Sequence, residues 1–228
     1  MVLEVCCGSL ASALAAVEGG AERIELCSAL FLDGLTPSVG TIRALRRRFP
    51  DLRIHVLIRP REGDFVYSED ELRVMEQDIS LAVDAGATAI VSGALTAEGN
   101  LDTTATARLI EASAGLPFTF HRAFDLIQDQ PSALRQLQRL GVTRVLTSGG
   151  AATAEAGIPA LRRLVQQGGV IILPGGGVNR HNAQRIVQET GATEIHGSCS
   201  ITLANGLRQT SAEEVQAVLN SLSSTPGK

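Results

Sequence analysis

Residues 2–27, VLEVCCGSLASALAAVEGGAERIELC, contain one complete strand–helix–strand unit. The short apolar runs Val2–Cys6 and Arg23–Cys27 predict strands, whereas the alanine-rich stretch Ser9–Glu18 predicts a helix. Gly19-Gly20 stops that helix, because glycine is a poor residue for a helix interior and a good one for the turn that follows. Two strands that are joined by a helix lie parallel in one sheet, so the unit predicts a parallel α/β fold.

The same alternation of strand and helix continues to the end of the chain. Six further strands are expected at Arg53–Ile58, Thr88–Ser92, Phe118–His121, Arg144–Thr147, Val170–Leu173 and Glu194–His196. Helices are expected at Pro37–Phe49, Ser68–Ala85 and Ser211–Leu222, and from near Asp102, Pro131, Thr153 and Asn179. Units of about 28 residues with parallel connections fit either an open, doubly wound sheet or a closed barrel.

Two features favour the barrel. An open sheet usually carries a Gly-x-Gly-x-x-Gly turn after its first strand, but residues 7–9 read Cys-Gly-Ser. Eight strands are also the number that closes a TIM barrel. We therefore predict an α/β, single-domain (β/α)8 TIM barrel over residues 1–228, with a frayed tail after about residue 222. On this fold the working site lies where the strands end.

Composition narrows the functional classes. The formal net charge is −4 and the only basic run is Arg46–Arg48, which argues against a nucleic-acid partner. The N-terminus does not resemble a signal peptide, no apolar run suits a bilayer, and four cysteines do not form a secreted disulfide pattern. We expect a cytoplasmic protein with no membrane partner and no nucleotide cofactor. The single lysine is Lys228, which excludes Schiff-base chemistry on a barrel strand.

Strand alternation places a charged set of side chains inside the barrel. Positions that would face the helices are apolar, as at Val5 and Ile24. The opposite parity points inward and carries Glu4, Cys6, Glu25, Cys27, His55, Arg59, Thr119, His121, Glu194, His196 and Ser198. One interpretation is that these residues are paired ions in the core, with Arg23 or Arg59 neutralising the glutamates. The other is a functional site, because so many charges converge on one end.

A site at this end would divide into two groups of residues. The candidate catalytic groups are Glu4, Glu25, Asp64, His121 and His196. The candidate substrate-binding residues are Arg59, Arg61, Arg122, Asp125, Ser148, Gly176, Gly177 and Ser198, since arginine forks and glycine-rich loops suit an anion. The loops 147–150, 174–177 and 196–198 are expected to expose N–H groups, although tight turns alone would explain their glycines. His55 is expected in the core and His181 on the surface.

The cysteines raise the question of a metal. Cys6 and Cys27 end adjacent strands, which lie about 4.8 Å apart, so their thiols are expected to approach one another. Two soft thiolates in reach of one ion suit Cu(I) better than magnesium or calcium. The alternative is that both are small buried apolar residues with inert thiols. Cys7 is expected to face a helix and Cys199 to lie in a loop, both with structural roles.

Several segments together resemble the CutC family. They are Leu-Glu-Val-Cys (3–6), Glu-Arg-Ile-Glu-Leu-Cys-Ser (22–28), Gly-Leu-Thr-Pro-Ser (34–38), Ile-Arg-Pro-Arg-Glu-Gly-Asp-Phe-Val-Tyr-Ser (58–68), Thr-Phe-His-Arg-Ala-Phe-Asp (119–125), Leu-Thr-Ser-Gly-Gly (146–150), Pro-Gly-Gly-Gly-Val (174–178) and Glu-Ile-His-Gly-Ser (194–198). The resemblance implies a cytoplasmic barrel, a homo-oligomer (dimer or tetramer), a role in copper homeostasis, and Cys6 and Cys27 as copper ligands. The chain departs from the family at Asp33, where a second glycine is usual, and at Cys7, which adds a thiol.

Three functions therefore stay open. The first is Cu(I) binding in copper homeostasis through Cys6 and Cys27. The second is a (β/α)8 enzyme of isomerase or lyase type that acts on a small anionic or phosphorylated substrate at the mouth. The third, a purely structural or interaction protein, leaves the polar mouth unexplained and ranks last.

Overall fold

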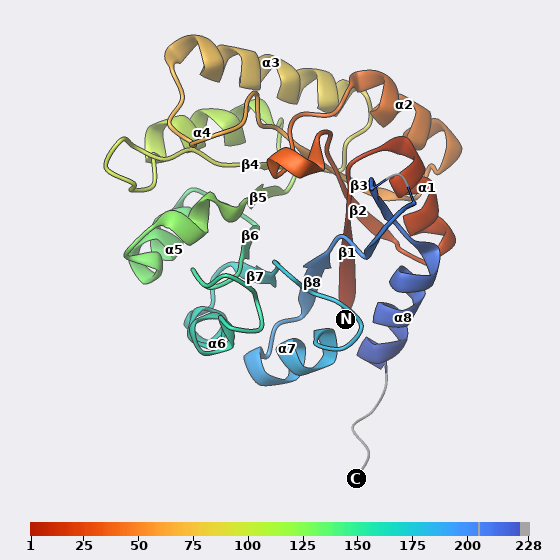
Figure 1. The fold of residues 1–228 in the computed structure, drawn as a ribbon. Coiled ribbons are helices and arrows are strands. Elements are labelled where there is room, and N and C mark those ends of the chain that lie inside the picture. The colour runs from red at the N-terminus through yellow and green to blue at the C-terminus, as the bar shows by residue number, and fades with distance from the viewer. Residues whose placement is uncertain (205, 224–228) are drawn as a thin grey trace.

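Eight parallel strands form the centre of the molecule and helices surround them (Figure 1). This computed structural model describes residues 1–204 and 206–223. The strands are β1 (Val2–Cys7), β2 (Arg23–Leu26), β3 (Arg53–Leu57), β4 (Ala89–Ser92), β5 (Phe118–Phe120), β6 (Arg144–Thr147), β7 (Ile171–Pro174) and β8 (Glu194–Gly197). Their order in the sheet is β7-β6-β5-β4-β3-β2-β1-β8, and β7 packs against β8. The predicted (β/α)8 barrel is confirmed.

An outer ring of helices covers the barrel. It consists of α1 (Leu10–Glu18), α2 (Val39–Arg48), α3 (Glu69–Asp84), α4 (Thr103–Ala112), α5 (Gln130–Arg139), α6 (Ile158–Gln167), α7 (Ala183–Thr190) and α8 (Ala212–Ser223). The last helix, α8, contacts both α7 and α1 and so completes the ring (Figure 1). The helix α8 extends to Ser223, and the frayed tail expected after about residue 222 falls on residues 224–228, which lie outside the described residues.

Three helices begin later than the sequence predicts. Pro37 is not the first residue of α2; instead Ser38 caps this helix by accepting the N–H of Thr41. The helix expected from Thr153 begins at Ile158 as α6, and the one expected from Asn179 begins at Ala183 as α7. Turns precede the first regular residues of α6 and α7, and such turns are hard to separate from a helix by sequence alone, whereas before α2 the backbone is still extended at Ser38.

Side-chain alternation divides the core into two parts. Val5, Ile24, Ile54 and many other strand residues are fully buried in an outer apolar layer between strands and helices. A second, small apolar cluster of Cys6, Cys27, Leu57 and Val91 belongs to the opposite face of the strands, inside the barrel. Cys7 is packed in the outer layer, as expected from its parity.

Three short elements extend the mouth beyond the predicted pattern. A hairpin of β9 (Ser200–Thr202) and β10 (Arg208–Thr210) separates β8 from α8. Two 3-10 helices, η1 (Leu30–Leu32) and η2 (Arg122–Leu126), follow β2 and β5. Asp33 ends η1 with a φ of 63°, a left-handed conformation that suits glycine best.

We expect Gly157→Ala to lower the free energy of unfolding by about 1–3 kcal/mol or more. The φ of Gly157 is −84°, which any residue can adopt, but an added Cβ would overlap the carbonyl oxygen of Ser148. Gly40→Ala is the matched control, because the nearest atom to its Cβ is 3.9 Å away; we expect it to be neutral or to stabilise by up to about 1 kcal/mol. Urea denaturation measures both, and equal effects would contradict the steric argument.

Candidate functional site

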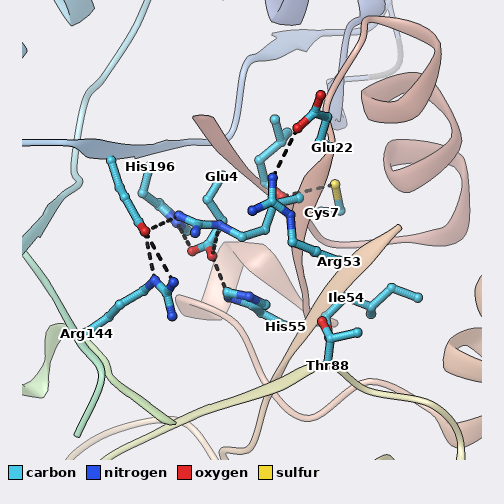
Figure 2. A network of polar contacts seen from close by, with 12 residues as sticks. Glu4, Cys7, Glu22, Arg53, Ile54, His55, Thr88, Arg144 and His196 are labelled. Atoms are coloured by element: carbon cyan, nitrogen blue, oxygen red, sulfur yellow. Dashed lines mark hydrogen bonds and ion pairs between the residues drawn. The ribbon is translucent and has the colours of Figure 1, made fainter. Parts of the chain in front are cut away.

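A buried ion network lies inside the barrel and is centred on the Glu4 carboxylate (Figure 2). Its Oε2 is 2.9 Å from Arg23 Nε and 2.7 Å from His55 Nδ1, and its Oε1 is 2.9 Å from His196 Nδ1. The strand register explains this meeting, because Glu4 on β1 lies opposite Arg23 on β2 and His196 on β8. Burial alone would raise the pKa of Glu4, but the two histidines hold it well below its usual value.

Glu194 extends the network on the side of the barrel away from the mouth. Its carboxylate lies 2.5 Å from Arg23 Nη2 and 2.8 Å from Arg144 Nε. Every charge in this network therefore has an opposite charge beside it. Glu4 lies beneath the cavity at the mouth together with His55, and neither is in its lining; for Glu4, the interpretation as a paired core ion describes the contacts.

The mouth holds a cavity of about 770 Å³. The predicted site residues in its lining are Cys6, Glu25, Arg59, His121, Arg122, Asp125, Gly176, Gly177, His196 and Ser198. They come from the ends of β1, β2, β3, β5, β7 and β8 and from the loops that follow. Strand alternation therefore brings most of the predicted set to one place.

The remaining predicted residues lie elsewhere. Asp64 and Arg61 form an ion pair of 2.9 Å on the exposed rim, where Arg61 also pairs with Glu71. The Arg61 guanidinium lowers the pKa of Asp64. Ser148 is buried beside Asp125, and Cys27 lies behind Cys6 in the inner apolar cluster.

Cys6, Glu25 and His196 form a compact group at the floor of the cavity. One ligand atom of each lies within 4.8 Å of the others. Cys6 Sγ is 3.5 Å from Glu25 Oε1 and 3.9 Å from Cys27 Sγ. Because His196 Nδ1 is bound to Glu4, Nε2 is the ring nitrogen left for a ligand. Arg59, suggested above as a partner of the glutamates, forms no ion pair with Glu25 or with any other described residue.

The protonation of this group follows from its burial and its neighbours. Burial raises the pKa of Glu25. The neighbouring Cys27 thiol, followed by burial, raises the pKa of Cys6 well above its usual value. Burial would lower the pKa of His196, but the carboxylates of Glu25 and Glu4 outweigh it and raise the pKa. The Cys6 thiol, whose ordinary pKa is already above neutral, therefore keeps its proton at neutral pH and lies beside the carboxyl group of Glu25.

His121 and Arg59 line another part of the cavity. His121 Nδ1 accepts the N–H of Ala123 at 3.3 Å, and the ring lies against Phe65 with centroids 4.7 Å apart. Burial, together with the nearby Arg59 charge, lowers the pKa of His121 to about 3. The imidazole is therefore neutral at physiological pH.

The loop after β6 does not offer free N–H groups, which corrects the prediction for residues 147–150. Asp125 accepts the N–H groups of Ser148 and Gly150 at 3.0 and 3.1 Å and the hydroxyl of Thr147. Arg122 Nε donates to the same carboxylate at 2.8 Å. An internal carboxylate thus fills the position where a ligand anion was expected.

Sequence reasoning missed part of the lining. Phe65, Asp33, Arg208 and Cys199 all face the cavity, the last two from the segment between β8 and α8. The Asn-Gly pair at 205–206 between two short polar runs is a hairpin signal that would have identified β9 and β10. Phe65 had no such signal, because a single aromatic residue in a loop does not indicate what it contacts.

Comparison with known proteins identifies the family. The CutC family model matches residues 1–201. The chain belongs to the CutC family. A family protein CutC from Bacteroides thetaiotaomicron is 47% identical over 207 residues, which are 90% of this chain and 83% of the relative. The human copper homeostasis protein cutC homolog is 44% identical over 209 residues, 91% of this chain and 76% of the relative.

A solved structure extends the similarity to three dimensions. The crystal structure of CutC from Streptococcus agalactiae superposes with a TM-score of 0.83 at 38% identity, covering 87% of this chain and 98% of that chain. The CutC assignment therefore agrees with the sequence resemblance and with the barrel. Among the described residues of this CutC family member, no helix combines the length and apolar character that crossing a membrane requires.

We expect Glu4→Gln to lower the free energy of unfolding at neutral pH by about 3–5 kcal/mol, because it leaves Arg23 and two histidines without their shared counter-ion. The difference in the free energy of unfolding between the variant and the wild type should become smaller in acid. A carboxyl group with a lowered pKa stabilises the fold above its unfolded pKa, and this stabilisation is lost as the pH falls through the folded pKa. Urea denaturation at several pH values measures both effects.

Glu22→Gln is the matched control, because it removes an exposed ion pair with Arg53 of 3.1 Å. We expect its denaturation midpoint to match that of the wild type. A Glu4→Gln protein as stable as this control would show that the buried network does not stabilise the barrel.

Proposed function

We propose that this CutC family member binds Cu(I) through Cys6 and Cys27 at the floor of the mouth and that this binding is its function in copper homeostasis. The observation that carries the proposal is the distance of 3.9 Å between the two Sγ atoms, which lets one ion contact both. Both cysteines are free and buried, and Leu57 and Val91 surround them with apolar side chains. Soft thiolates in an apolar setting favour Cu(I) over hard cations.

His196 and Glu25 supply further ligand atoms for the same ion. Both have a ligand atom within 4.8 Å of Cys6 Sγ. The hydrogen bond of 2.9 Å between His196 Nδ1 and Glu4 orients the ring, as second-sphere carboxylates do for metal-bound histidines. Because the pKa of Cys6 is raised, binding of the ion would release the thiol proton.

The family and the cysteines support the setting of this function. The human relative is named a copper homeostasis protein homolog, which supports copper as the cargo. Four free cysteines suit a reducing compartment, so we place the protein in the cytoplasm. A homo-oligomer, dimer or tetramer, is part of the same proposal.

Titration of the reduced protein with Cu(I) in the presence of a competing chelator tests the proposal. We expect Cys6→Ser/Cys27→Ser to lose at least about tenfold in affinity, because hydroxyls are poor ligands for Cu(I). Cys7→Ala is the matched thiol control, since the Cys7 side chain lies on the helix side of β1. A double variant that binds as tightly as the wild type would end the proposal.

A second candidate function is favoured by a separate observation. Glu25 Oε2 and His121 Nε2 are buried and line the cavity, yet neither has a hydrogen-bond partner within the described part of the chain. Native proteins rarely leave buried polar atoms unpaired outside functional sites. A carboxylate and an imidazole that face one cavity suit proton transfer, so we propose an isomerase or lyase acting on a small anionic substrate as the alternative.

Incubation of the protein with pooled small anionic metabolites in D2O tests this alternative. Isomerases and lyases that remove a proton from carbon exchange it with solvent, so we expect deuterium to enter one metabolite, as seen by mass spectrometry. Glu25→Gln should lose the exchange and retain the wild-type circular dichroism spectrum. Absence of exchange in the wild type, or unchanged exchange in the variant, would contradict the assignment of Glu25.

A further inference from the structure

Arg59 is a buried cation without a counter-ion among the described residues. Its side chain is only 4% exposed, and it lines the cavity. Two of its guanidinium nitrogens donate to backbone carbonyls, at 2.8 Å to Leu32, 3.1 Å to Gly34 and 2.9 Å to Gly63. Nε has no hydrogen-bond partner, and no carboxylate of residues 1–204 or 206–223 forms an ion pair with Arg59. Neutral carbonyls satisfy part of the donor capacity but leave the charge uncompensated.

Four other arginines of the barrel interior and the mouth differ from Arg59 in this respect, while Arg208, which also lines the cavity, is exposed to solvent and donates to Ser200. Arg23 pairs with Glu4 and Glu194, Arg144 pairs with Glu194, and Arg122 pairs with Asp125. Arg61 on the rim pairs with Asp64 and Glu71. Since unpaired buried charge is unfavourable, the exception at Arg59 indicates that an anion from outside the chain completes this part of the cavity.

His121 presents a second unused donor next to Arg59. Because Nδ1 accepts the N–H of Ala123, the proton of the neutral ring is assigned to Nε2, which has no acceptor among the described residues. The Phe65 ring packs against both side chains: its centroid is 5.0 Å from Arg59 Cζ and 4.7 Å from the centroid of the His121 ring. The wall of the cavity thus combines a positive charge and a neutral N–H donor held by one aromatic ring.

We propose that Arg59 and His121 form an oxyanion-binding subsite that holds the carboxylate or phosphate group of a small ligand. The loop after β6 is closed to such a group, because Asp125 already occupies its N–H donors. The subsite also consists of other residues than the cluster of Cys6, Glu25 and His196 at the floor of the cavity. If the protein is the enzyme proposed as the alternative function, this ligand is its substrate, and Arg59 and His121 hold the anionic group of that substrate. Only the identification of the ligand as a substrate rests on the enzyme alternative.

Binding of two simple anions to the whole protein tests the subsite. Inorganic phosphate and acetate are titrated separately at constant ionic strength with chloride; isothermal titration calorimetry gives the affinity of the wild type and of each variant, and in the wild type the His121 Nε2 resonance is followed by 15N NMR. We expect at least one of them to shift this resonance saturably, and the arm that responds distinguishes a phosphate site from a carboxylate site. His121→Phe keeps the ring against Phe65 and removes the donor, so we expect the affinity to fall by about tenfold or more.

Two controls keep the test decisive. His181→Phe replaces an exposed histidine and should bind like the wild type, and Arg59→Lys, which keeps the charge but loses the fork, should bind more weakly. If His121→Phe does not fold, the wild-type titration decides alone. Absence of a saturable shift for both anions, or equal affinity in His121→Phe, would overturn the proposal. Neither anion needs to react, so failure to find turnover would remove the enzyme alternative and leave the subsite standing.

Discussion

The structure depends on the neutralisation of a carboxylate inside a closed barrel. Glu4 is completely buried, and it is stable there because Arg23, His55 and His196 surround its two oxygens at 2.7–2.9 Å. The register of the parallel strands β1, β2, β3 and β8 brings these side chains to the same level inside the barrel. The ion network therefore forms only in this register, and its contacts in turn favour this register. The hydrogen bond with Glu4 also orients the ring of His196, which lines the floor of the cavity at the mouth.

Above this network the cavity divides into two chemically different parts. On the side of β1, β2 and β8, thiols, a carboxylate and an oriented imidazole offer ligands for a soft metal ion or groups for proton transfer. On the side of β3 and β5, Arg59 Nε and His121 Nε2 are buried and have no acceptor among the described residues. A copper function uses the first part and leaves the second unexplained, whereas an enzyme would use both. The family name alone does not choose between them, because a barrel carries many chemistries.

The fold and the composition of the site could be predicted because both follow from strand periodicity. Alternate residues of a strand face opposite sides, so charged positions among apolar ones identify the inner face without any knowledge of packing. Which residues pair with one another through hydrogen bonds and ion pairs does not follow from strand periodicity, and the predictions of these partners were less successful. The N–H groups of the loop after β6 were expected to be free for a ligand but are accepted by the Asp125 carboxylate, and Pro37 was expected to open a helix that Ser38 caps instead. Both outcomes depend on hydrogen bonds between residues whose relative position the sequence does not contain.

The sequence by itself determined the eight strands, the end of the barrel that carries polar residues, and the approach of Cys6 to Cys27, because each depends on local pattern and on the spacing of neighbouring strands. Only the tertiary structure decided which charges cancel. Arg23 and Arg59 are both buried, yet Arg23 meets two carboxylates and Arg59 meets none in the part of the chain that the structure describes. Charge neutralisation acts over a few ångströms between segments far apart in the chain, and that distance exists only after the barrel has closed.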